Sequence, residues 1–191
     1  APASPNGEHR LALYESIREY AAEKLGQSGT AEAAEARHSA YYLGLAEGAP
    51  FELEAARLSL EESNLLAALE REVRWGVAGR GWETPLRLAL ALGPLVRVRG
   101  LTEAERALLD SAVEGARTAP SSPALSAQGL LLRASLRIER GLLAPAEEDL
   151  SLALELAGAA SSAELKARVR VGRAELWVSS GKLARAEAEL T

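Results

Sequence analysis

The stretch that decides the fold runs from Ala134 to Leu156 and reads ASLRIERGLLAPAEEDLSLALEL. A second copy begins 40 residues later, at Ala174, and reads AELWVSSGKLARAEAEL. A weaker third copy lies 41 residues upstream of the first, around Gly100. A fixed period in this range is typical of stacked helical repeats. The spacing therefore predicts helix pairs that pack one after another.

The composition also favours helices. Hydrophobic residues make up 48% and charged residues 26% of the 191 residues, which is the balance of a folded globular protein. Aromatic residues are only 4%, so the core must be built mainly from Leu, Ala and Val. Leu and Ala have the highest intrinsic helix propensities. We therefore expect an all-α protein.

Charge and residue usage disfavour several classes of function. The net charge of −5 argues against direct contact with nucleic acid, because binders of phosphate backbones usually carry a basic surplus. No apolar run is long enough to cross a bilayer and no secretory signal is visible, so we expect a cytoplasmic protein with no membrane contact. Cysteine is absent, which excludes disulfides and thiolate metal sites. The missing initial methionine and the end inside a repeat suggest a piece of a longer polypeptide.

The predicted organisation has two parts. Residues 1–80 form a helical amino-terminal region, and residues 81–191 carry the repeats, placed at 82–118, 122–157 and 162–191, the last of them truncated. We expect the amino-terminal region to contain helices at 15–25 and 30–47, and either one long helix over 51–75 or two short ones that meet near residue 59.

Local signals mark the ends of the predicted helices. Pro94 predicts a kink in a helix over 82–99. Thr102 and Glu105 have the spacing of a capping box. Ser122 before Pro123 predicts another helix start, as does the box-like SSAE at 161–164.

The helix over 162–179 carries two apolar stripes, as expected for a helix covered on two sides. The two stripes are Leu165, Val169, Gly172 and Leu176, and Ala167, Val171, Ala174 and Val178. We expect alanines to recur where helix axes approach most closely, at Ala134, Ala146, Ala153, Ala174 and Ala186.

The copies resemble the tetratricopeptide pattern of a small residue, a turn glycine, and then alanine and leucine on the second helix. Ala134, Gly141, Ala146, Leu150 and Ala153 fill this pattern, and the usual period of 34 is lengthened here to 40 or 41. The resemblance implies an all-α, right-handed superhelix of antiparallel helix pairs, an α-solenoid.

The amino-terminal half resembles large bacterial LuxR-like and AfsR-like signal-transducing regulators. LYESIREYAAEKL at 13–25 is similar to the family's LETIREYA segment, and ESNLLAAL at 62–69 is similar to its NLRAAL stretch. In that family the first segment ends a winged-helix domain, so residues 8–25 would be a remnant of one. The resemblance implies a sensor or interaction arm beside an ATPase that lies outside this segment.

No catalytic, cofactor or metal site is predicted. His9 and His38 are the only histidines, and neither has a second ligand at metal-like spacing. There is no phosphate-binding loop and no dinucleotide fingerprint. We therefore expect a protein that is not an enzyme.

Two alternative binding surfaces remain. The repeat template places a concave groove on the first helices of the pairs, lined by Arg87, Arg97, Gln128, Leu131, Ser135, Ile138, Glu139, Arg168, Val171, Glu175, Val178 and Ser179. The helical spacing alone suggests instead a basic ridge of Arg133, Arg137, Arg173 and Trp177. The template is favoured, because Trp177 is more naturally buried than displayed.

The function predicted is binding of a peptide, protein or small effector in the groove, as part of a bacterial signalling ATPase and transcriptional regulator. The alternative is a self-association module without a separate ligand. The uncapped final helix favours a homodimer of that kind.

Overall fold

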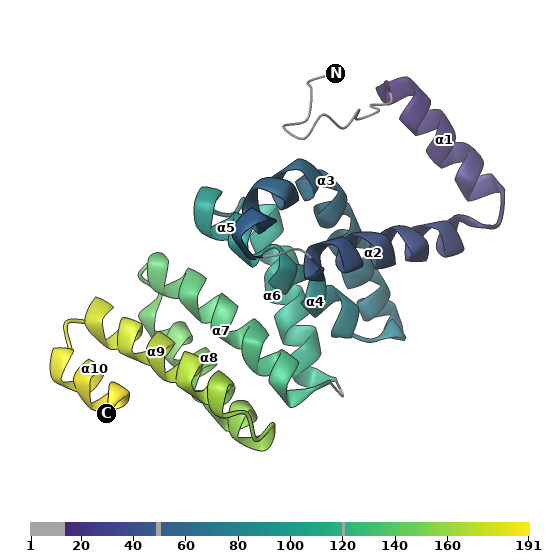
Figure 1. Cartoon of the computed structure of the whole chain (residues 1–191). Helices are drawn as coiled ribbons and strands as arrows, with labels where there is room; N and C mark the ends of the chain where they lie inside the picture. Colours follow the sequence, from purple (N-terminus) through teal and green to yellow (C-terminus); the bar gives the residue numbers. More distant parts are fainter. Residues whose placement is uncertain (1–13, 49–50, 120) are drawn as a thin grey trace. The chain divides into compact units, whose positions relative to one another are not determined.

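The computed structural model describes residues 14–48, 51–119 and 121–191. These ranges contain helices and turns and no strand, which confirms the predicted all-α class (Figure 1). The chain divides into two compact units, residues 1–38 and 39–191. Each unit is described by itself below.

The first unit contains α1 (Glu15–Gln27) and the beginning of α2 (Ala31–Glu47). Helix α1 buries none of its residues, and Ile17 and Tyr20 are exposed on it. The predicted winged-helix remnant at 8–25 lies partly outside the described residues, which begin at Tyr14.

The second unit starts with the end of α2 and continues through α3 (Phe51–Trp75), which is one long helix. A π-helical turn, η1 (Gly76–Arg80), follows α3 directly. Its helical conformation is interrupted at Gly79, which has a φ of 92°, a value that glycine adopts without the strain other residues would meet. Because α3 packs against the helices that follow it, this compact unit begins well before residue 81, where the repeats were predicted to start.

The remaining helices form three successive pairs, and the first helix of the first pair is interrupted after Ala91. The segments are α4 (Glu83–Ala91) with α5 (Gly93–Arg99), then α6 (Glu103–Thr118), α7 (Pro123–Glu139), α8 (Leu143–Ala159), α9 (Ala163–Ser179) and α10 (Leu183–Leu190).

The period of 40 recurs in the helix boundaries. The first helices of the pairs begin at Glu83, Pro123 and Ala163, each 40 residues after the last. The turns after α7 and α9 are also equivalent: Gly141 and Gly181 both have φ of 73°. Their amides donate to the carbonyls three residues back at the same distance, 2.9 Å. The repeat is thus a structural unit as well as a sequence pattern.

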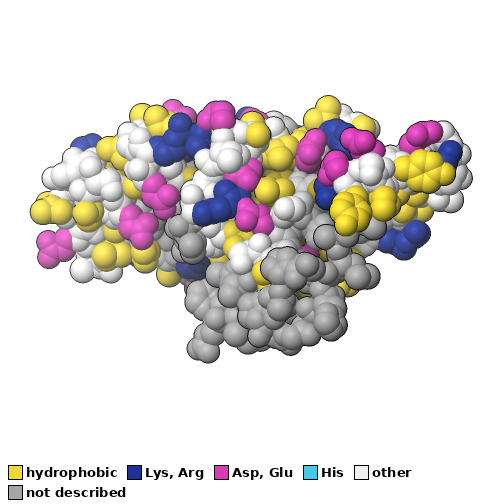
Figure 2. Space-filling model, turned by 90° about the horizontal axis from the view of Figure 1, so that it is seen from above, with side chains coloured by type: hydrophobic (Ala, Val, Ile, Leu, Met, Phe, Trp, Pro, Cys, Tyr) yellow, Lys and Arg dark blue, Asp and Glu magenta, His cyan; other side chains and the backbone are white. Residues whose placement is uncertain are grey.

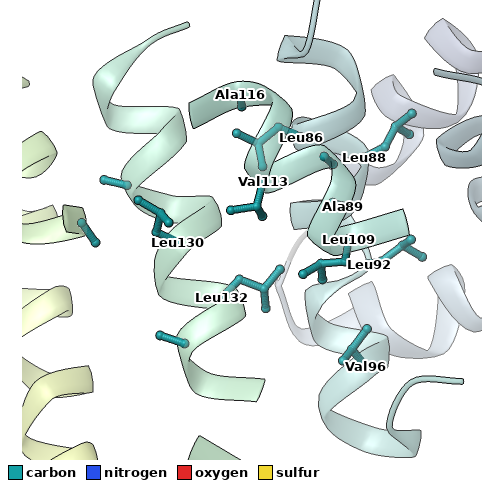
Figure 3. Close-up of a cluster of buried hydrophobic side chains, with 14 of the residues drawn as sticks. Leu86, Leu88, Ala89, Leu92, Val96, Leu109, Val113, Ala116, Leu130 and Leu132 are labelled. Carbon is teal, nitrogen blue, oxygen red and sulfur yellow. The ribbon is translucent and has the colours of Figure 1, made fainter. Parts of the chain in front are cut away.

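Packing follows the order of the pairs. Helix α9 packs on both α7 and α8, and α7 packs on both α4 and α6. Figure 3 shows the junction of the first two pairs, where Leu86, Val113 and Leu130 from three helices point toward one another. Gly129 permits this approach, because a Cβ there would lie 2.6 Å from Leu86 Cδ1. The five alanines predicted at close approaches are all buried.

Most local signals are confirmed. The kink that Pro94 predicted is found as a break between α4 and α5 at Leu92, two residues before the proline. The capping box is complete, with the Thr102 amide donating to Glu105 at 2.8 Å and the Glu105 amide donating to Thr102 Oγ1 at 3.3 Å. The box predicted over 161–164 is wrong by one residue, because Ser162 caps the Leu165 amide and Ser161 has a positive φ.

Two remaining predictions about helix faces turn out differently. Ser122 precedes α7 as expected but makes no side-chain capping bond. On α9 the first apolar stripe is fully buried, whereas Val171 and Val178 of the second stripe are exposed.

Neither a membrane span nor a metal cluster is found in the described ranges. None of their helices is both long and apolar enough to cross a bilayer. Their His, Asp and Glu side chains form no group of three or more that could hold a metal ion.

Candidate functional site

A pocket of about 410 Å³ opens where the first helices of the three pairs meet. Helix α7 packs on both α4 and α9, so residues of α4, α5, α7 and α9 contribute to the lining of the pocket. We call it the first-helix pocket. It is lined by Leu90, Gly93, Pro94, Gln128, Leu131, Leu132 and Arg168.

The break between α4 and α5 shapes one side of the pocket. The turn at Leu92 brings Gly93 and Pro94 to the lining, opposite α7. Gly93 lies beside Leu132, because a Cβ at Gly93 would be in ordinary van der Waals contact with Leu132 Cδ1, at 3.5 Å. The pocket floor is therefore apolar and made by backbone as well as side chains.

Polar groups reach the pocket from two helices. Gln128 of α7 is half-buried and Arg168 of α9 is exposed. Within the described part of the chain the Arg168 guanidinium has no ion pair and no hydrogen bond, so its five N–H donors are open to a ligand. Gln128 adds an amide that can donate or accept.

Arg168 differs in this respect from most other arginines. Figure 2 shows one face of the molecule, on which Lys and Arg side chains (dark blue) lie beside Asp and Glu side chains (magenta). Arg87, for example, donates from Nε to Glu47 at 2.7 Å and lies 3.8 Å from Glu83. Arg87 is thus tied to α2 and is absent from the pocket lining, although the repeat template placed it in the groove.

The structure brings together only part of the predicted groove. Gln128, Leu131 and Arg168 line the pocket, as the template predicted. Ser135 is half-buried and donates to the Leu131 carbonyl at 3.1 Å. The side chain of Arg97 lies outside the described residues. Three further template positions are exposed beyond the pocket: Glu139, Glu175 and Ser179.

The basic ridge is not an open surface, and the geometry predicted for it is wrong. Arg133 is only 7% exposed and donates through Nε and Nη2 to the two oxygens of Asp149, at 2.9 and 2.7 Å. Arg137 donates to the same carboxylate at 2.7 Å and to the Pro145 carbonyl at 3.0 Å. These arginines clamp α7 to α8 instead of facing a ligand.

The other end of the supposed ridge is internal as well. Trp177 is 5% exposed, and the cations of Lys182, just before α10, and of Arg185 in α10 lie over its ring at 5.1 and 5.2 Å. Arg173 approaches Glu189 at 3.3 Å. Trp177 and Arg173 of α9 thus contact residues at and within α10, the second helix of the same pair.

The clamp is itself a repeated feature that sequence reasoning missed. Arg173 lies 40 residues after Arg133, and Glu189 lies 40 residues after Asp149. A basic residue on α7 and α9 and an acidic residue on α8 and α10, both at the period of 40, was the signal that could have found it.

The groups that line the first-helix pocket are suited to recognising a ligand. The pocket offers an apolar floor, one amide and one unpaired guanidinium. Comparison of the chain with family models, with curated proteins and with solved structures finds no significant match.

Proposed function

We propose that the chain is a tetratricopeptide-like, right-handed stack of helix pairs that binds an acidic segment of a partner polypeptide across its first helices. The observation that supports this most is the first-helix pocket, where an apolar floor adjoins the unpaired Arg168 and Gln128. A volume of about 410 Å³ falls within the range of pockets that hold small ligands or one or two side chains.

The ligand's chemistry follows from that lining. Leu90, Leu131 and Leu132 would receive an apolar side chain, while Arg168 would pair with a carboxylate or a phosphate. A guanidinium binds such groups through two parallel hydrogen bonds, which orients the ligand as well as attracting it.

The resemblance of residues 13–25 and 62–69 to bacterial signal-transducing regulators suggests where such binding would act. The chain would be a sensor arm of a cytoplasmic regulator, and it would have no catalytic role. A ligand that binds one arrangement of the whole regulator more tightly than another would shift its activation equilibrium.

Selection and crosslinking test this proposal. Peptides are selected from a displayed random library against the full chain, and the binders are then crosslinked from a photoreactive residue placed at Gln128. We expect enriched peptides to carry an acidic residue next to an apolar one and to crosslink at this position.

The same photoreactive residue at Glu147, which is exposed on α8, is the matched control. Peptides that crosslink equally from Glu147, or a selection without acidic enrichment, would contradict binding in the first-helix pocket.

A further inference from the structure

Charged side chains of opposite sign lie along α9 on the side that reaches the first-helix pocket. Arg168 lines the pocket itself, and Glu175 follows it by seven residues on the same helix. Seven residues are close to two turns of an α-helix, so the two side chains leave α9 on the same side, about 10 Å apart along its axis. Helix α9 therefore presents a positive charge at the pocket and a negative charge beyond it.

Helix α7 adds a second negative charge at the corresponding end. Gln128 lines the pocket, and Glu139 follows it by eleven residues, close to three turns, so both lie on one side of α7. Glu139 is exposed even though α9 already packs on α7, so the neighbouring pair of helices does not cover it. Figure 1 shows that α7 and α9 run in the same direction. Glu139 and Glu175 thus both lie toward the carboxyl ends of their helices.

Both carboxylates are open to a ligand. Within the residues that the structure describes, neither accepts a hydrogen bond from a side chain or forms an ion pair, and the exposed Arg140 next to Glu139 does not pair with it. Arg170 and Arg173 of α9 approach Glu189 of α10 instead, at 3.6 and 3.3 Å. Glu139 also ends α7, where the helix dipole disfavours a negative charge, so helix stability does not account for it.

We propose that the ligand of the first-helix pocket is an extended polypeptide segment that carries a basic residue about three residues away from its acidic one. The acidic side chain pairs with Arg168, and the basic side chain reaches the carboxylates of Glu175 and Glu139. A span of about 10 Å corresponds to three residues of an extended chain, at about 3.3 Å each. This inference rests on the proposed function, because it describes the ligand of the same pocket.

The charge pattern would supply specificity that the pocket alone lacks. A segment that is acidic throughout would pair with Arg168 but would bring like charges against Glu175 and Glu139. Repulsion of that kind suppresses wrong partners, whereas complementary charges of both signs fix how the segment lies across the helices.

The probe is a displayed peptide library in which an aspartate–leucine pair is fixed and the flanking positions are randomised. The library is selected against the full chain and sequenced before and after selection. We expect lysine and arginine to be enriched about two- to fivefold at the position about three residues from the aspartate, which is the gain expected from an exposed ion pair.

Two double variants of the chain make the result specific. Glu139→Lys with Glu175→Lys reverses the negative end, and it should replace the basic enrichment by enrichment of aspartate and glutamate. Glu147→Lys with Glu155→Lys makes the same change in net charge on α8, and it should leave the basic enrichment intact. All four residues are exposed, so both variants should keep the native circular dichroism spectrum.

Failure of the charge pattern is distinguishable from failure of the proposed function. Peptides that bind the wild-type chain and lose binding with Arg168→Glu, yet show no basic enrichment, would overturn the charge pattern alone. Basic enrichment that survives Glu139→Lys with Glu175→Lys, or that both double variants abolish, would overturn it as well. A selection in which no peptide is enriched would contradict the proposed function and the charge pattern together.

Discussion

At the scale of single residues, Asp149 joins α8 to two arginines of α7. Its carboxylate accepts from Arg133 and Arg137, and its side chain is only 6% exposed. Asp149→Ala leaves the Arg133 charge buried without its main partner, which typically costs about 3–5 kcal/mol. Urea denaturation should show this loss in the free energy of unfolding.

Glu147→Ala, on the exposed side of the same helix, should change stability by less than about 0.5 kcal/mol. Replacing Arg133 and Asp149 together by Met and Leu should recover most of the loss, because the most buried charge is then removed and the half-buried Arg137 keeps its hydrogen bond to the Pro145 carbonyl. A loss below about 1 kcal/mol for Asp149→Ala would show that water reaches Arg133.

Glu105 links stability to pH. Hydrogen bonds from Arg99 lower its pKa from 4.5 to about 2, against the opposing effect of burial and with help from Thr102. The folded state therefore favours the carboxylate, so this stabilisation is complete above about pH 4.5 and is lost as the pH falls toward 2. Wild type should be more stable than Glu105→Gln at pH 6, and the difference should shrink by pH 3. A constant difference would contradict this.

The sequence could predict caps and turns but not these charge pairs. The Thr102–Glu105 box and the glycine turns depend on residues close in the chain. The Arg133–Asp149 pair joins two helices, so a helical wheel of α7 alone makes Arg133 look solvated.

At the scale of elements, glycines decide how closely the helices approach. In α6 a Cβ at Gly115 would lie 2.1 Å from Trp82 Cδ2. Gly115→Ala should therefore destabilise the chain by about 1–3 kcal/mol or more, although alanine favours helix by about 1 kcal/mol. Thermal unfolding followed by circular dichroism measures this.

Gly44→Ala in α2 is the matched control, because nothing lies within 4 Å of the Cβ it adds. It should raise stability by about 0.5–1 kcal/mol through helix propensity alone. Equal effects of the two substitutions would mean that Trp82 does not occupy the Gly115 surface.

Element boundaries also explain the mixed period of the first copy. Helix starts repeat at 40, whereas the buried residues Leu109 and Ala112 precede Leu150 and Ala153 by 41. The sequence indicated both spacings, since the repeats were predicted to begin at 82, 122 and 162. The buried positions of α6 therefore come one residue earlier after the helix start than those of α8, since Leu109 follows Glu103 by six residues and Leu150 follows Leu143 by seven.

At the scale of the whole molecule, the order of packing produces the pocket. The template predicted Gln128 and Arg168 because they occupy equivalent positions on successive first helices. It missed Leu90, Gly93 and Pro94, since their place depends on how the broken first helix lies against α7. Long-range packing of this kind cannot be read from spacing.

The most direct measurement is calorimetric titration of a selected acidic peptide into the full chain and two charge-reversed variants. Arg168→Glu removes the pocket's guanidinium, whereas Lys166→Glu makes the same change on the same helix outside the lining. We predict at least about a tenfold loss of affinity for Arg168→Glu and little change for Lys166→Glu. Equal affinities for the two variants would contradict binding in the first-helix pocket.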